Sequence, residues 1–151
     1  MQKHDQLSLT DLRQRIVELR RLRQQMKDAN RRPRQHRLNA SERAQILEKT
    51  GGRCHICGGD ITGSWHADHV LAHSAGGQNN SDNYLPAHKT CNNYRWDYLP
   101  QEFELILKLG VWVRTQIEKG TDIGAEIEHK FTAYEAKRIA RRKSQTGNDS
   151  V

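Results

Sequence analysis

CHICGGDITGSWHADHVLAHSAGGQNNSDNYLPAHKTCNNYR, residues 54–95, contains every cysteine of the chain, arranged with one histidine in two short pairs. Cys54 and Cys57 form a C-x-x-C pair, and His88 and Cys91 form an H-x-x-C pair later in the segment. Two such pairs fill a tetrahedral zinc site and leave no coordination position for a substrate or an activated water. We therefore predict a structural zinc that joins the two ends of this segment. The alternative is three free cysteines and an incidental histidine.

A second group of side chains in the same segment suits a hard divalent cation, which prefers oxygen ligands. Asp68 offers a carboxylate oxygen and Asn92 an amide oxygen, the kinds of ligand that Mg²⁺ or Mn²⁺ prefers. His69 offers an imidazole, which suits proton abstraction from water near neutral pH. Trp65 to Leu71 is the best strand candidate in the chain, and in a regular strand Asp68 and His69 point to opposite faces. The sequence thus predicts a catalytic divalent ion and a general base close together.

Composition limits the class of protein. With 151 residues, of which 34% are hydrophobic and 28% charged, the chain is long enough for one modest polar domain with appendages. No run approaches the ~20 apolar residues of a membrane span, and the N-terminus lacks the apolar core of a signal peptide. Three cysteines cannot all pair as disulfides, and thiolates that hold a metal are typical of a reducing compartment. We expect a soluble, cytoplasmic protein.

The net charge of +7 is confined to one end of the chain. Residues 1–38 hold eleven Lys or Arg against four Asp or Glu, and the remainder has equal numbers of each sign. This arm is a candidate for contact with a polyanion such as DNA, and the alternative is a solvated helix face. The arginines proposed for that contact are Arg20, Arg23, Arg31, Arg32, Arg34 and Arg37.

Apolar spacing predicts helices on both sides of the central segment. In the arm, Ser8 begins a helix whose apolar stripe (Leu9, Leu12, Ile16, Leu19 and Met26, interrupted by Arg23) needs a partner. That partner is the body of the domain or a second copy of the chain, which makes a homodimer a candidate. Around Pro33 the pattern becomes a basic linker.

Capping signatures predict the remaining helices. Residues 39–42 open a short helix that Gly51 and Gly52 end. A second helical pattern starts at residue 81 or 82, but Pro86 makes it irregular, so we expect an early turn there and a better helix after residue 91. Residues 101–119 form a helix, a short one spans 123–131, and Thr132 caps a separate last helix with a basic end. The polar tail, 144–151, is expected to be disordered.

Taken together, these motifs resemble the HNH endonuclease family across roughly residues 43–95. The matching features are the two metal-binding pairs, Asp68-His69-Val70, the glycine pair at 76–77, Asn83 before an apolar pair, and Asn92 directly after the last cysteine. The resemblance implies an α+β, mostly helical protein with a small ββα-metal core. We assign residues 1–38 to a basic helix and linker, 39–99 to the HNH core, 100–143 to a helical extension and 144–151 to the tail.

The resemblance also implies a role for each residue. His69 is the general base, Asp68 and Asn92 hold one divalent ion, and Asn83 steadies the loop and orients the base. Arg95 is a candidate phosphate contact, and His66 and His73 are secondary candidates. The implied reaction is phosphodiester hydrolysis that leaves a 5′ phosphate and a 3′ hydroxyl.

Three positions depart from the family pattern: Asn92 stands where His is common, His88 where Cys is usual, and Ala72 where Pro is common. None of them removes a catalytic group. The rival interpretation is a zinc-stapled DNA-binding or assembly module without catalysis. RNA in place of DNA, nicking against double-strand cutting, the recognition sequence and the biological role remain open from the sequence.

Overall fold

The computed structural model describes residues 12–31 and 37–146, and the chain divides into two compact units, Met1–Phe103 and Glu104–Val151. The first unit contains helices α1 (Leu12–Ala29), α2 (Ala40–Glu48) and α3 (Lys89–Arg95) and strands β1 (Trp65–His69) and β2 (Tyr84–His88). Two short 3₁₀ helices, η2 (His73–Ala75) and η3 (Ser81–Asn83), lie between the strands. Helix α4 (Pro100–Glu118) runs from the first unit into the second, which also contains α5 (Asp122–Thr146).

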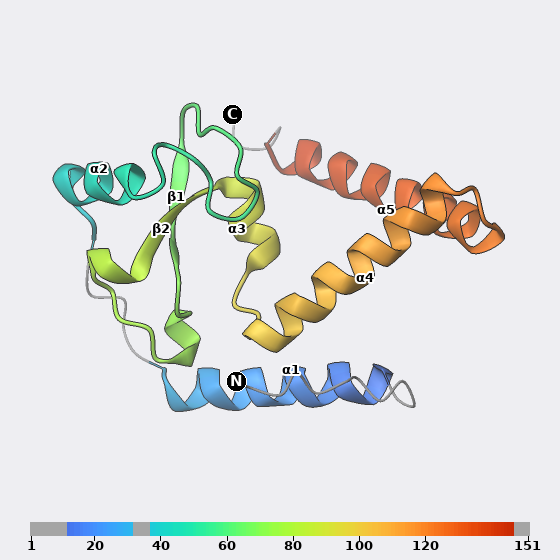
Figure 1. Ribbon diagram of the computed structural model, residues 1–151, viewed down its shortest axis with the longest axis horizontal. Coiled ribbons are helices and arrows are strands. Elements are labelled where there is room, and N and C mark those ends of the chain that lie inside the picture. Colours follow the sequence, from blue (N-terminus) through green and yellow to red (C-terminus); the bar gives the residue numbers. More distant parts are fainter. Residues whose placement is uncertain (1–11, 32–36, 147–151) are drawn as a thin grey trace. The chain divides into compact units, whose positions relative to one another are not determined.

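The core of the first unit is a β-hairpin followed by a helix (Figure 1). Strands β1 and β2 are antiparallel, with Trp65 opposite His88 and His69 opposite Tyr84. Ile46 of α2 and Ala87 of β2 are fully buried and form the apolar centre together with Cys54. This arrangement confirms the predicted α+β, mostly helical fold with a small ββα core.

The second strand corrects the sequence-based assignment for residues 81–88. We expected an early turn from residue 81 or 82 and a better helix only after residue 91. The turn is η3, but Tyr84 to His88 form β2, and α3 already begins at Lys89. Pro86 explains the outcome, because its missing N–H is tolerated at the edge of a two-stranded sheet and not inside a helix. Its carbonyl oxygen accepts from the backbone N–H of His55 at 3.0 Å, which ties the first metal-binding pair to the strand.

Helix α2 begins and ends as the sequence predicts. The Asn39 side chain accepts from the N–H of Glu42 at 2.9 Å, and the Glu42 carboxylate accepts from the N–H of Asn39 at 2.8 Å. Past its C-terminus Gly51 and Gly52 both have positive φ, and the N–H of Gly52 donates to the carbonyl of Leu47 at 3.0 Å. The turn delivers the chain directly to Cys54.

Helix α1 carries two buried side chains, Leu19 and Arg23, which are 3% and 8% exposed. Arg23 Nε donates to Glu102 at 2.9 Å, and its Nη1 bonds Asp97 at 3.3 Å. The guanidinium charge is therefore neutralised inside the protein, which argues against the DNA contact assigned to Arg23. Leu19 is buried in the single chain, whereas Leu12 and Ile16 of the same stripe are 38% and 43% exposed, so the homodimer stays a prediction. The proposed start at Ser8 and the linker around Pro33 lie outside the described residues.

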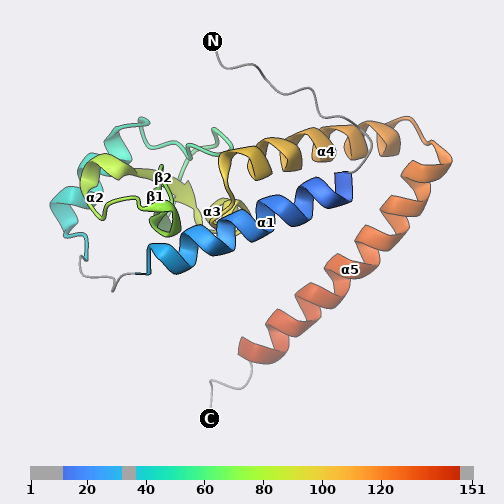
Figure 2. The same ribbon diagram turned by 90° about the horizontal axis from the view of Figure 1, so that it is seen from below.

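The second unit differs from prediction in its helix count. Gly120, with φ of 61°, ends the turn after α4, and the Thr121 hydroxyl accepts from the N–H of Gly124 to begin α5. From there α5 runs without interruption to Thr146 (Figure 2), so the break and new cap expected at residues 131–132 are wrong. A Thr-x-x-Glu pattern also fits inside a helix, where Glu135 pairs with Arg138 at 3.2 Å.

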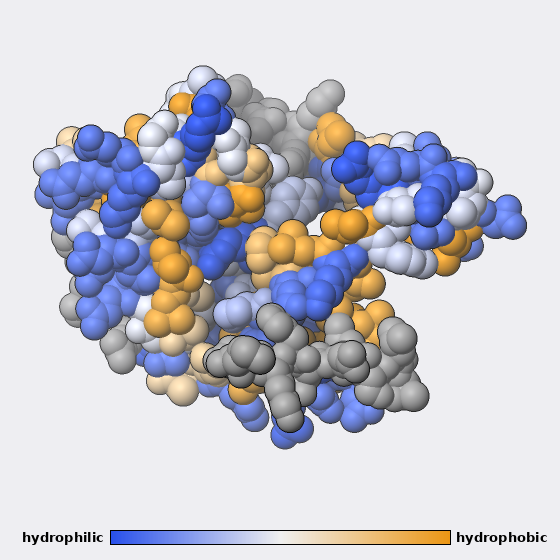
Figure 3. Space-filling model, in the orientation of Figure 1, coloured by the Kyte–Doolittle hydropathy of each residue, from blue (hydrophilic) through white to orange (hydrophobic). Residues whose placement is uncertain are grey.

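Apolar side chains are exposed along α4 (Figure 3), including Leu107, Val111 and Trp112 at 54%, 68% and 48%. Within residues 12–31 and 37–146, no helix combines the length and the apolarity that crossing a membrane requires.

Candidate active site and metal centre

The two predicted metal-binding pairs meet at the junction of β2 and α3. One ligand atom from each of Cys54, Cys57, His88 and Cys91 lies within 4.8 Å of every other. The Nδ1 atom of His88 is 3.4 Å from the sulfur of Cys57 and 3.9 Å from that of Cys91. Tetrahedral zinc with bonds of about 2.0–2.3 Å separates its ligand atoms by roughly 3.5–3.8 Å. The four residues therefore fit a zinc ion with a small contraction.

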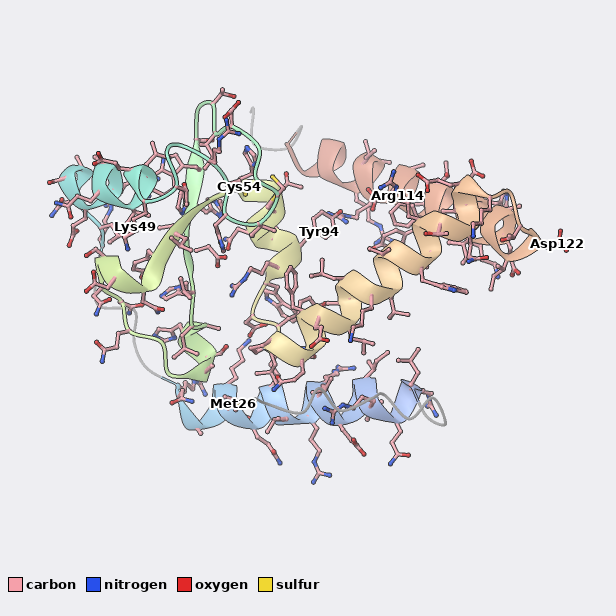
Figure 4. The ribbon with its side chains drawn as sticks, viewed as in Figure 1. Met26, Lys49, Cys54, Tyr94, Arg114 and Asp122 are labelled. Carbon is pink, nitrogen blue, oxygen red and sulfur yellow. The ribbon has the colours of Figure 1, made fainter. Side chains whose placement is uncertain are left out.

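Backbone groups around the cluster prepare its ligands. Burial alone would raise the pKa of the Cys54 thiol, but backbone N–H groups of Cys57, His88 and Ile56 lower it to about 6. Figure 4 shows Cys54 beside the N-terminal end of α3. His88 Nε2 lies 3.0 Å from the carbonyl oxygen of Asp60, so Nε2 is the donor and Nδ1 is directed to the cluster.

The last thiol needs a cation at the centre. Burial, followed by the neighbouring Cys57 and Cys54, raises the pKa of the Cys91 thiol to about 12. Three thiolates close together repel each other unless a positive ion neutralises them. The donor set of three sulfurs and one nitrogen thus suits zinc rather than a hard cation.

A cleft of about 1130 Å³ beside this cluster collects most of the remaining candidates. It is lined by residues of α1, α2, β1, η2, β2 and α3 and by the connections between them. The residues of predicted function that line it are Asp68, His69, Asn92, Arg95, His66, His73, Arg31 and Arg37. The structure thus brings the proposed base and both proposed ligands of the divalent ion to one cavity.

Asp68 is 5% exposed and lies between two basic side chains. His55 Nε2 is 2.7 Å from Asp68 Oδ2, and Arg95 Nη1 is 3.2 Å from Asp68 Oδ1. Sequence reasoning missed His55, although its place at the tip of the C-x-x-C pair was a visible signal. Each carboxylate oxygen retains a second lone pair, so Asp68 can still bind a cation.

Arg95 also fixes the end of β1. Its two terminal nitrogens donate to the carbonyl oxygens of His69 and Val70, both at 3.1 Å. This side chain therefore has a positioning role within the site, and its phosphate contact stays a prediction.

His69 is held by Asn79, a residue that sequence reasoning did not select. His69 Nε2 is 2.8 Å from Asn79 Oδ1, and the Tyr84 hydroxyl donates to the same oxygen at 3.2 Å. The Tyr84 ring lies against the imidazole, with centroids 4.4 Å apart. Because an amide oxygen only accepts, Nε2 carries the proton of the neutral imidazole and Nδ1 is its basic atom.

Asn83 holds the loop between the strands and does not line the cleft. Its amide accepts from the N–H of Leu71 at 2.9 Å and donates to the carbonyl oxygens of Leu71 and Gln78 at 3.0 and 2.9 Å. Gly77 permits this closure, because a Cβ there would lie 1.8 Å from the Leu71 oxygen. The geometry fits the loop-steadying role implied for Asn83, whereas the contact with the base comes from Asn79.

Asn92 meets His66 across the cleft. The Asn92 amide is 2.9 Å from His66 Nδ1, and His66 lies two residues before Asp68, on the same face of β1. The carboxylate of Asp68 and the amide oxygen of Asn92 are a donor set that suits a small divalent cation which keeps several waters. Asp68 and Asn92 both line the cleft, so the chemistry of these two donors fits a second ion there.

The basic residues divide into three groups. Arg31 and Arg37 are exposed and line the cleft, where Lys27 joins them, and Arg20 is exposed on α1. Arg23 is buried in ion pairs. Arg32 and Arg34 lie outside the described residues.

Comparison with known proteins identifies the segment that forms both sites. Residues 54–95, less than a third of the chain, match the family model described as HNH endonuclease. No curated protein and no solved structure matches the chain. The family match confirms the resemblance drawn from the sequence and assigns an HNH domain to the ββα core.

Proposed function

We propose that this HNH domain is a metal-dependent DNA endonuclease that hydrolyses phosphodiester bonds. The observation that supports it most directly is the cleft, in which Asp68, His69 and Asn92 line one cavity together with exposed arginines. A pure binding module requires cationic side chains and has no need of a positioned imidazole beside a nearly buried carboxylate.

His69 is the proposed general base. With Nε2 directed at Asn79, the imidazole takes a proton from water at Nδ1. The water oxygen forms a bond to phosphorus while the bond from phosphorus to the 3′ oxygen breaks. The 3′ oxygen leaves with a proton from solvent, which gives a 5′ phosphate and a 3′ hydroxyl.

Asp68 and Asn92 are the proposed ligands of Mg²⁺ or Mn²⁺. Such an ion, when bound, neutralises charge on the phosphate and on the leaving oxygen. His55 and Arg95 hold the Asp68 carboxylate in place, and Arg95 also fixes the backbone after His69. Asn83 preserves the loop that carries Asn79. Zinc at Cys54, Cys57, His88 and Cys91 is structural in this proposal, because its four positions are filled.

DNA is the proposed substrate because exposed basic side chains border the cleft. Arg31 and Arg37 line the cleft and are the proposed contacts to the phosphates of a strand that enters it, and the exposed Arg20 of α1 is a further proposed contact. Arg32 and Arg34 belong to the same basic arm in sequence.

The test is cleavage of supercoiled plasmid with Mg²⁺, Mn²⁺ or EDTA, comparing the wild type with His69→Ala and with His129→Ala, a control on the exposed surface of α5. We expect metal-dependent cleavage that falls about 10²- to 10⁴-fold in His69→Ala and is unchanged in the control. Equal zinc content in all three proteins excludes loss of the core. DNA that is shifted in a gel but stays intact under every metal would establish the binding-module alternative.

A further inference from the structure

Trp96 ends α3 in a strained conformation. Its φ and ψ are 48° and −143°, and it is the one non-glycine residue with positive φ in the part of the chain that the structure describes. Its N–H donates to the carbonyl of Asn92 at 2.8 Å. A bulky L-residue disfavours this backbone region, so the fold holds Trp96 there against its own conformational preference. Trp96 remains 52% exposed, so burial of its side chain does not explain the strained backbone.

The strained residue lies at the reactive end of the cleft. Trp96 lines that cavity one helical turn after Asn92 and directly after Arg95, whose guanidinium contacts Asp68. A ligand seated against the exposed indole would therefore be next to the groups proposed to hold and cleave the phosphate.

Cations surround the indole. Arg23 Cζ lies 4.6 Å and Lys27 Nζ 6.0 Å from the ring centroid, and Tyr98 meets the ring edge-on at 5.5 Å. Arg23 is neutralised by its own ion pairs, but the Lys27 side chain is 51% exposed. Proteins bind single-stranded nucleic acid with exposed aromatic rings that stack on bases and with nearby cationic side chains that contact the phosphates.

We propose that Trp96 stacks on an unpaired base of the strand held in the cleft, so that the substrate is single-stranded or locally unpaired DNA. In a regular duplex each base is already stacked between its neighbours and offers no open face. This inference rests on the proposed function for the identity of the ligand, and base stacking can be measured without cleavage.

The competing explanation is that Trp96 only docks α1 through Arg23. Two DNA strands with equal numbers of phosphates, one with bases and one without, distinguish a stacking role of Trp96 from a docking role. The probes are oligothymidylate of about 16 nucleotides, the upper end of known single-strand site sizes, and an abasic strand of equal length. His69→Ala serves as the reference protein, so that the probes stay intact, and affinity is measured by fluorescence anisotropy.

We expect the reference protein to bind the base-containing strand about tenfold more tightly than the abasic strand. Adding Trp96→Ala should abolish that preference while leaving abasic binding unchanged, and Trp96→Phe should retain part of it. Trp112→Ala, which removes an exposed indole of α4 outside the cleft, is the matched control and should behave like the reference. Quenching of indole emission by the base-containing strand should disappear only with Trp96.

An equal loss of affinity for both strands in Trp96→Ala would show a docking role and overturn the proposal, as would an unchanged preference for bases. The plasmid assay stays separate. Cleavage by the wild type without any base preference refutes stacking and leaves the nuclease standing. A preference for bases without cleavage under any metal would support stacking and refute the nuclease function.

Discussion

The zinc cluster and the cleft lie in the same segment, yet the sequence determines them to different degrees. In the cluster, the two ligands of each pair are separated by two residues, so local backbone geometry brings the members of a pair together and the fold has only to join the two pairs. In the cleft, the contacts that set the chemistry join residues far apart in sequence, such as His55 with Asp68 and His66 with Asn92. Short spacing therefore reveals which residues form a site, whereas the partners that orient them emerge only from the fold.

The largest expected effect comes from removing zinc. Structural zinc contributes about 10–16 kcal/mol in small zinc-dependent domains. The first unit has only a small buried core around Ile46 and Ala87, so chelation or Cys54→Ala should abolish its cooperative thermal unfolding, measured by circular dichroism. His69→Ala, in the cleft, should leave the same transition in place.

Zinc added back after chelation should restore the transition, and Mg²⁺ at equal concentration should not, because the ligands are thiolates and imidazole. A zinc-free protein that unfolds at the same temperature would show that the cluster does not hold the core together. The zinc cluster would then not be distinguished from the cleft by a structural role.

The next largest effect tests Arg23, whose burial in ion pairs argues against the DNA contact predicted for it. Arg23→Ala should lower the free energy of unfolding by about 3–5 kcal/mol, because it leaves Glu102 as a buried carboxylate without its cation. Arg20→Ala, on an exposed part of the same helix, should change stability little and reduce the salt dependence of DNA binding by about one phosphate contact. Urea denaturation and binding at several salt concentrations measure the two effects.

If Arg23→Ala weakens DNA binding while its unfolding midpoint stays unchanged, the original assignment is restored. From the sequence alone, Arg20 and Arg23 are equivalent members of one basic segment. Only the position of Glu102 and Asp97, more than seventy residues later, tells them apart.

The features recovered from sequence are those with a local cause. The two metal-binding pairs, the cap at Asn39 and the glycine turn at 51–52 each depend on residues within one or two turns of chain. The failures have non-local causes. Strand β2 was not predicted, because its residues follow a turn and become a strand only through pairing with β1. Helix α5 continues through Thr132, where the Thr-x-x-Glu pattern lies inside the helix and Glu135 pairs with Arg138.

Asn79 provides a test on the cleft side of the comparison. Asn79→Ala removes the acceptor for His69 Nε2 and should lower kcat about 10- to 100-fold, with KM little changed, because substrate contacts remain. Asn80→Ala is the matched control, since Asn80 caps η3 and has no contact with the imidazole among the described hydrogen bonds.

The readout that a general loosening of the loop would not produce is the tautomer of His69. Nitrogen NMR should show the proton on Nε2 in the wild type and in Asn80→Ala, and a mixture of tautomers in Asn79→Ala. An unaltered tautomer together with full kcat would mean that Asn79 does not position the base.

The smallest expected effect comes from Asn39, whose capping role is easy to predict from sequence but contributes little to the free energy of unfolding. The capping box at Asn39 is as legible in the sequence as the zinc pairs, and both of its hydrogen bonds form. Asn39→Ala should nevertheless lower the free energy of unfolding by only about 1 kcal/mol, since it exposes one turn of α2 to solvent and leaves the core intact. Ser41→Ala, exposed in the same turn, should change it by less than about 0.5 kcal/mol. Urea titration of both variants with zinc bound measures the difference. A loss from Asn39→Ala as large as that from removing a zinc ligand would mean that α2 supports the cluster itself, through the turn at Gly51 and Gly52, and that the two local patterns form one cooperative unit.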